Sequence, residues 1–176
     1  MLAAGEGNAA SLRGTLAAWW GIGGFTFMLA VSVYRLAALA ADSFQMPWHL
    51  GHQILFIGNL LVMLWVEGYR GFQLKFSPRF AQRAVELRSR NTIVEAIAAP
   101  LVLMGMLYAP RRQLIASWLL TAGIVVIVLV YRAMPQPWRG ILDAGVAAAL
   151  LWGLVATVFL SVRALGGEAA DAHYAP

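Results

Sequence analysis

The sequence contains no cysteine, and it contains few charged residues for a chain of 176 residues. The absence of cysteine excludes disulfide bonds, thiolate metal sites and cysteine nucleophiles. Charged residues make up only 12% of the chain, whereas about 25% is usual in a soluble domain. Hydrophobic residues make up 61%, which is more apolar surface than a soluble core uses. The composition therefore favours an integral membrane protein.

Several stretches approach or exceed the length of about 20 apolar residues that crosses a bilayer. We expect an all-α fold, with one transmembrane helical domain over residues 1–165 and a polar tail over 166–176. Five spans are expected, at about residues 16–40, 48–66, 93–109, 114–130 and 141–162. The third span is the shortest and contains Pro100, so two alternatives stay open: it crosses, or it only dips into the membrane.

A short amphipathic helix is expected over residues 78–90. Ser77 is a suitable N-cap, and Pro78 suits the first helical position. Apolar residues share one face of this segment, and arginines spread over the other faces. We therefore expect this helix to lie in the headgroup plane and to bind anionic lipid headgroups.

Twelve of the thirteen basic residues are arginine, and most of them flank the expected spans. If the N-terminus is cytoplasmic, nine basic residues lie inside and four lie outside, which satisfies the positive-inside rule. The four outside would be Arg35, Arg111, Arg112 and Arg163. Location in a bacterial inner membrane is expected. Five spans put the C-terminus in the periplasm, whereas four crossings return it to the cytoplasm.

One face of the helix over 48–66 and the polar residues after it is polar from end to end. At about 100° per residue its polar side chains fall within an arc of roughly 120°. They are His49, His52, Gln53, Asn59, Glu67 and Arg70. Such groups are costly against lipid, so this polar stripe should face other helices, a subunit or a bound ligand.

Two interpretations of the polar stripe stay open. In the first, its side chains form interhelical hydrogen bonds that select one packing arrangement. In the second, they bind an amphipathic ligand such as a quinone, a tetrapyrrole or a lipid, near the aromatic residues Trp48 and Phe56. The candidate ligand-binding residues are His49, His52, Gln53 and Asn59. No metal site is predicted, because two histidines without a nearby ligand set are insufficient, and the cofactor is unknown.

A cluster of ionisable residues is expected on the cytoplasmic side, made of Glu67, Arg70, Glu95, Arg139 and Asp143. Unpaired ions are costly there, so these groups should pair and tie three spans together. A proton or anion path and a lipid-headgroup site are the alternatives. Between Asn59 and Glu67 the helix offers only Leu, Val, Met and Trp, which argues against a proton relay.

Small residues recur at every fourth position of the last span. They are Gly145, Ala149, Gly153, Thr157 and Ser161. This small-residue ridge predicts close approach of another helix, either from the same chain or from another subunit.

Two segments of the sequence carry distinctive motifs. The first is Glu67-Gly-Tyr-Arg-Gly-Phe-Gln73 followed by Phe76-Ser-Pro-Arg79. The second is Pro135-Gln-Pro-Trp-Arg-Gly-Ile141 followed by Asp143-Ala-Gly145. Together they resemble a family of uncharacterised bacterial polytopic inner-membrane proteins. The resemblance spans most of the chain and implies that the two Arg-Gly segments act together. It implies no activity and no catalytic residue.

Motifs of soluble enzymes are absent from the sequence, including the phosphate-binding loop, the dinucleotide fingerprint, the His-Glu-x-x-His zinc motif and the Gly-x-Ser-x-Gly elbow. No catalytic residue is assigned, and an enzyme is disfavoured. The leading interpretation is a noncatalytic accessory subunit or assembly factor that binds another membrane protein or a second copy. The alternatives are the binder of an amphipathic ligand described above and a small oligomeric transporter or channel. Nothing indicates a nucleic-acid partner.

Overall fold

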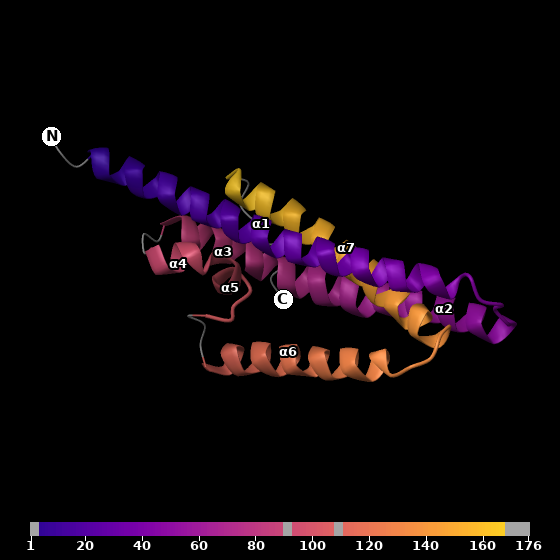
Figure 1. The fold of residues 1–176 in the computed structure, drawn as a ribbon. Helices are drawn as coiled ribbons and strands as arrows, with labels where there is room; N and C mark the ends of the chain where they lie inside the picture. Colours follow the sequence, from indigo (N-terminus) through magenta and orange to yellow (C-terminus); the bar gives the residue numbers. More distant parts are fainter. Residues whose placement is uncertain (1–3, 90–92, 108–110, 168–176) are drawn as a thin grey trace.

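The computed structural model describes residues 4–89, 93–107 and 111–167, and this part of the chain is helical without strands. Its elements in chain order are α1 (Ala4–Ser43), α2 (Leu50–Met63), the π-helix η1 (Leu64–Phe76), α3 (Ser77–Ser89), α4 (Ile93–Ile97), α5 (Ala99–Leu103), α6 (Arg111–Arg132) and α7 (Trp138–Leu165). Figure 1 shows the long helices lying side by side, with α6 set apart from them. The prediction of an all-α fold is confirmed.

The three long rods are α1, the continuous helix formed by α2, η1 and α3, and α7 (Figure 1). The start of α7 packs beside the end of α1, where a Cβ on Gly140 would overlap the side chain of Ser43. At the opposite end, Arg88 donates to the carbonyl of Leu165 at 3.3 Å, and a Cβ on Gly14 would overlap the Arg88 backbone. The second rod is therefore parallel to α7 and antiparallel to α1.

The separate amphipathic helix that we expected over residues 78–90 is instead the last part of the second rod. No loop follows α2, because η1 carries the helix through the polar residues 67–76. Pro78 falls where the backbone pattern changes from i+5 to i+4 bonding, a position at which its missing N–H is tolerated. The apolar face of α3 is buried against α1 and α5, so α3 does not lie flat at a surface.

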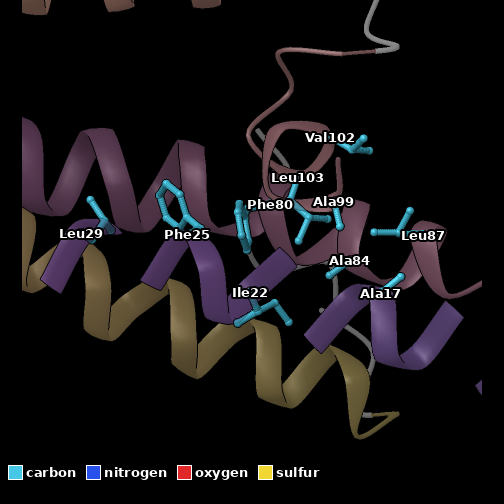
Figure 2. Close-up of a cluster of buried hydrophobic side chains, with 10 residues drawn as sticks. All are labelled: Ala17, Ile22, Phe25, Leu29, Phe80, Ala84, Leu87, Ala99, Val102 and Leu103. Atoms are coloured by element: carbon cyan, nitrogen blue, oxygen red, sulfur yellow. The ribbon is translucent and has the colours of Figure 1, made fainter. Parts of the chain in front are cut away.

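The core of the bundle lies where α1, α3 and α5 meet. Figure 2 shows its buried side chains: Ala17, Ile22, Phe25, Leu29, Phe80, Ala84, Leu87, Ala99, Val102 and Leu103. The Phe25 ring lies 4.8 Å from the Phe80 ring and 5.3 Å from the Phe76 ring, measured between centroids. Aromatic rings at these separations stabilise a contact beyond their buried area. They join the middle of α1 to the junction of η1 and α3.

The expected third span, residues 93–109, does not form one straight helix. It divides into α4 and α5, each five residues long and therefore only about 7.5 Å in length. Pro100 lies in the first turn of α5, and Gly105 adopts a φ of 76° that turns the chain after it. Residues 108–110 lie outside the described residues. Neither helix is long enough to cross a membrane by itself.

Close packing against α1 holds this pair of short helices. A Cβ on Gly21 would lie 2.6 Å from the Leu103 side chain, and one on Gly24 would lie 2.9 Å from Pro100. Glycine at both positions lets α5 approach the α1 backbone. The indole N–H of Trp20 also donates to the carbonyl of Ile97 at 3.4 Å.

Three helical segments of the described chain are long and apolar enough to cross a membrane: Leu12–Ser43, Leu50–Ser89 and Trp138–Leu165. They contain the expected spans 16–40, 48–66 and 141–162, with longer ends. The expected span 114–130 falls within α6, a 22-residue helix set apart from the three long rods (Figure 1). Five spans are not supported, because the segment 93–109 is broken into two short helices. Most of the expected tail, residues 168–176, lies outside the described residues.

Candidate functional site

His49 and His52 lie at the start of α2, where their polar groups complete the helix end. The backbone N–H of His49 donates to Nδ1 of His52 at 3.2 Å, and the His49 carbonyl accepts the N–H of His52 at 2.9 Å. Because Nδ1 of His52 is an acceptor here, the neutral ring carries its proton on Nε2. The His52 ring also lies edge-on to Trp138 of α7, at 4.6 Å between centroids. One role of His52 is therefore to join the start of α2 to α7.

The other two candidate ligand-binding residues point to different surroundings. Asn59 is half-buried, and its side-chain N–H donates to the carbonyl of Ile141 at 2.8 Å. Gln53 is exposed, as is His49. The structure therefore joins His52 and Asn59 to α7 but does not gather all four residues around one space.

A small groove lies between α2 and the start of α7. It has a volume of about 220 Å³ and is lined by Leu55, Asn59, Met134, Trp138, Ile141 and Leu142. Its wall is aliphatic except for the Asn59 amide and the Trp138 indole. His52 contacts the groove through Trp138, whereas the expected aromatic wall of Trp48 and Phe56 packs with Phe44 instead.

The five ionisable residues expected on one side do not form one cluster. Arg139 and Asp143 lie at the start of α7, beside the end of α1. Glu95 lies on α4, which packs on the first half of α1, roughly 20 residues and about 30 Å of helix away. Glu67 and Arg70 lie between these levels. The expected cluster depended on a third span that crosses, and the actual path of α4 and α5 separates its members.

Within the expected cluster, Arg139 and Asp143 form an ion pair. Their side chains are one helical turn apart, with Nε of Arg139 3.5 Å from Oδ2 of Asp143. The Asp143 side chain is almost completely buried, and its Oδ2 has no hydrogen-bond partner among the described residues. Arg139 therefore supplies the main compensation for a buried carboxylate.

The small-residue ridge of α7 is buried along its whole length against the second rod. A Cβ on Gly145 would overlap the amide of Asn59, and one on Gly153 would overlap the ring of Phe72. Thr157 donates to the carbonyl of Gly153 at 2.7 Å, so the Ser77 hydroxyl, 2.8 Å from Thr157 Oγ1, is the donor between the helices. The Ser161 hydroxyl is buried with no partner among the described residues. The sequence left open whether the helix that packs on this ridge comes from the same chain or from another subunit. In the structure it comes from the same chain.

The most unusual set of polar side chains lies on η1 and α3. It consists of Glu67, Arg70, Lys75 and Arg79. We call these four residues the charged strip. All four side chains are exposed. Opposite the strip, Gly68 packs against Trp152, and the indole N–H of Trp152 donates to Oε1 of Gln73 at 2.8 Å. Because α7 runs from Trp138 to Leu165, Trp152 lies at its middle. Much of the charged strip is therefore level with the middle of the most apolar helix of the bundle.

The helical wheel predicts that Glu67 and Arg70 lie on the polar stripe and face other helices, a subunit or a bound ligand, whereas both side chains are exposed in the structure. The reason for the difference is η1. Its i+5 hydrogen bonds rotate successive residues by less than 100°, so the helical wheel drifts through this segment. A π-helix of 13 residues is rare, and π-helical turns are frequent at functional sites.

No group of three or more His, Cys, Asp or Glu side chains among the described residues is arranged to hold a metal ion. The two Arg-Gly segments that carry the family resemblance lie apart, Arg70 and Gly71 in η1 and Arg139 and Gly140 at the start of α7. The chain matches no protein-family model, no curated protein and no solved structure. The resemblance stays a prediction.

Proposed function

We propose that the chain is a multi-pass inner-membrane protein whose crossing helices are α1, the second rod, α6 and α7. Four crossings agree with the element order, because α4 and α5 are too short to cross and α6 runs back along the bundle (Figure 1). This arrangement puts both ends of the chain on the same side of the membrane.

The distribution of basic residues supports this topology. Apart from the charged strip, six basic residues of the described helices lie toward the end of the bundle that holds Arg13: Arg13, Arg83, Arg88, Arg111, Arg112 and Arg163. Only three lie toward the other end: Arg35, Arg132 and Arg139. By the positive-inside rule, both termini are then cytoplasmic.

The proposed function is that of a noncatalytic accessory subunit or assembly factor of a membrane complex. The observation that carries this proposal is the exposed charged strip at the level of Trp152. Charged side chains at this depth are found against protein or water and are costly against lipid. Asn59, Ser77 and Thr157, which are also polar residues in the interior, have hydrogen-bond partners within the chain. A partner chain that covers the strip removes this cost.

Photo-crosslinking in native membranes tests the proposal. A photoreactive residue at Val66, which is 46% exposed and next to Glu67, is placed on the charged strip. The same residue at Val155, 59% exposed on α7, is the matched control on an apolar surface. The proposal predicts a discrete crosslinked polypeptide from Val66 and mainly lipid adducts from Val155. Identical lipid adducts from both positions would remove the subunit hypothesis.

A second candidate function is the binding of an amphipathic ligand in the groove between α2 and α7. The observation that favours it is the aliphatic lining beside Trp138 and His52, which offers an apolar wall with an N–H donor nearby. Replacing Leu142 with Phe fills the groove while leaving His52 unchanged. If the groove binds a ligand, a small molecule that is extracted with the wild-type protein is lost from this variant. Equal recovery from both proteins would exclude the groove.

A further inference from the structure

The charged strip carries an excess of positive charge. Arg70, Lys75 and Arg79 oppose only Glu67, and none of the three cations has a carboxylate partner in the described part of the chain. The next cations along α3 are engaged differently: Arg83 donates to the carbonyl of Leu103 at 3.1 Å, and Arg88 donates to that of Leu165. The strip therefore presents three exposed cations that the described fold leaves without counter-charges.

A second copy of this chain is a poor match for the strip. A symmetric dimer brings the same patch of both subunits together, so the three cations of one copy would meet those of the other. Like charges brought together in this way oppose association. Charge complementarity therefore favours a different polypeptide.

The depth of the strip also bears on which anion can reach it. Gln73 bonds to Trp152 at the middle of α7, and Phe80 contacts Phe25 within the apolar part of α1. At the same level α1 and α7 expose Phe27, Val155 and Phe159 to their surroundings. Lipid headgroups occupy the membrane surface and not this depth. Carboxylates carried by a transmembrane helix reach the strip directly.

We infer that the partner covering the charged strip is a different membrane protein that presents carboxylate side chains to Arg70, Lys75 and Arg79. This inference rests on the proposed accessory function and specifies the chemistry of its partner. Pairing with carboxylates compensates cations that lie at membrane depth. It also selects against a partner without acidic residues at this level.

Lys75 makes the inference directly testable, because it is the only lysine in the sequence. A membrane-permeable carbodiimide activates a buried carboxylate, which then forms an amide bond with the Lys75 amine and releases a urea. Treatment of native membranes should join the full-length chain to another polypeptide, with the bond located at Lys75 by peptide mass spectrometry. Lys75→Arg keeps the charge but removes the amine. This variant should lose the amide bond while keeping the Val66 photo-crosslink.

Charge reversal supplies the second measurement. Lys75→Glu combined with Arg79→Glu should lower the Val66 photo-crosslink about tenfold or more, whereas Lys75→Arg combined with Arg79→Lys should retain it. Both side chains are exposed, so a thermal unfolding curve unchanged from wild type serves as the folding control. A Val66 photo-crosslink that survives charge reversal, with no amide bond at Lys75, would overturn the acidic partner but leave the accessory function standing. Absence of any crosslinked polypeptide in the wild type would instead overturn the proposed function itself, and lipid adducts alone would assign the strip to anionic lipid.

Discussion

Trp152 of α7 donates its indole N–H to the side-chain oxygen of Gln73 in η1 at 2.8 Å. This bond joins the middle of α7 to the π-helix, and Gly68 and Gly153 pack on either side of it. The same register brings Glu67, Arg70 and Lys75 to the middle of the bundle on the exposed side of the helix. The packing of α7 and the position of the charged strip are therefore two consequences of one contact.

Replacing Gly153 with Ala should destabilise the bundle. The new methyl group would overlap the Phe72 ring, and overpacking of this kind costs about 1–3 kcal/mol. Gly58→Ala is the matched control, because a Cβ there meets nothing within 4 Å. The control should be neutral or stabilising by up to about 1 kcal/mol, since alanine favours the helix. Thermal unfolding in detergent compares the two, and equal midpoints would show that α7 does not pack on η1 in this register.

A double-mutant cycle on Ser77 and Thr157 should reveal coupling between α3 and α7. Their hydroxyl oxygens are 2.8 Å apart and buried. Hydrogen bonds between membrane helices contribute about 0.6 kcal/mol on average, so a coupling energy of that size is expected for Ser77→Ala and Thr157→Val. Reversible unfolding of the four proteins in mixed micelles measures it. If the two single-mutant changes in the free energy of unfolding simply add in the double mutant, the two hydroxyls do not interact.

Arg139→Ala should lower stability more than Arg111→Ala. Arg139 compensates the buried carboxylate of Asp143, whereas Arg111 is exposed at the start of α6. Arg139→Ala should lower the free energy of unfolding by about 1–3 kcal/mol, as expected when a buried group loses its partner. Arg111→Ala should change it by no more than about 0.5 kcal/mol. Adding Asp143→Asn to Arg139→Ala should restore part of the loss, because the uncompensated charge is then removed. The same unfolding midpoint for Arg139→Ala and Arg111→Ala would contradict the ion pair.

The two ends of the chain should be found on the same side of the membrane. Reporter domains fused separately to the N-terminus and the C-terminus should both be active only in the cytoplasm, because four helices return the chain to its starting side. A reporter in the loop between α6 and α7 should report the opposite side. A periplasmic C-terminal reporter would restore five crossings and require the segment 93–109 to span.

The long helices could be predicted from the sequence because their signal is simple. Runs of apolar residues longer than about 20 indicate helices, and prolines and glycines mark their ends. The ridge from Gly145 to Ser161 was readable for the same reason, since a spacing of four places small residues on one side of α7. The sequence could not assign its partner, because any closely approaching helix satisfies that pattern.

The path of the chain between α3 and α6 was not readable. Span 93–109 is apolar enough to resemble a crossing helix, and Pro100 was compatible with either a kink or a break. Its break into α4 and α5 depends on packing against Gly21 and Gly24, some 80 residues earlier in the chain. The expected ion-pair cluster depended on that span, and the same break separates Glu95 from Arg139 and Asp143.

The charged strip was missed because of the π-helix. A helical wheel assumes a constant rotation per residue, and no local pattern in residues 64–76 signals i+5 bonding. Two features did point to this region: polar residues between two apolar segments, and Pro78 within what is one continuous helix. Both features more commonly mark a connection between two helices than one continuous helix.

Native mass spectrometry of the chain, released gently from its own membranes, tests the central claim most directly. The account predicts one dominant assembly whose mass equals this chain plus a different polypeptide, and it predicts dissociation of that assembly when Lys75 and Arg79 are both changed to Glu. A chain that leaves the membrane alone, or only as multiples of itself, would contradict the claim that a separate membrane protein covers the charged strip.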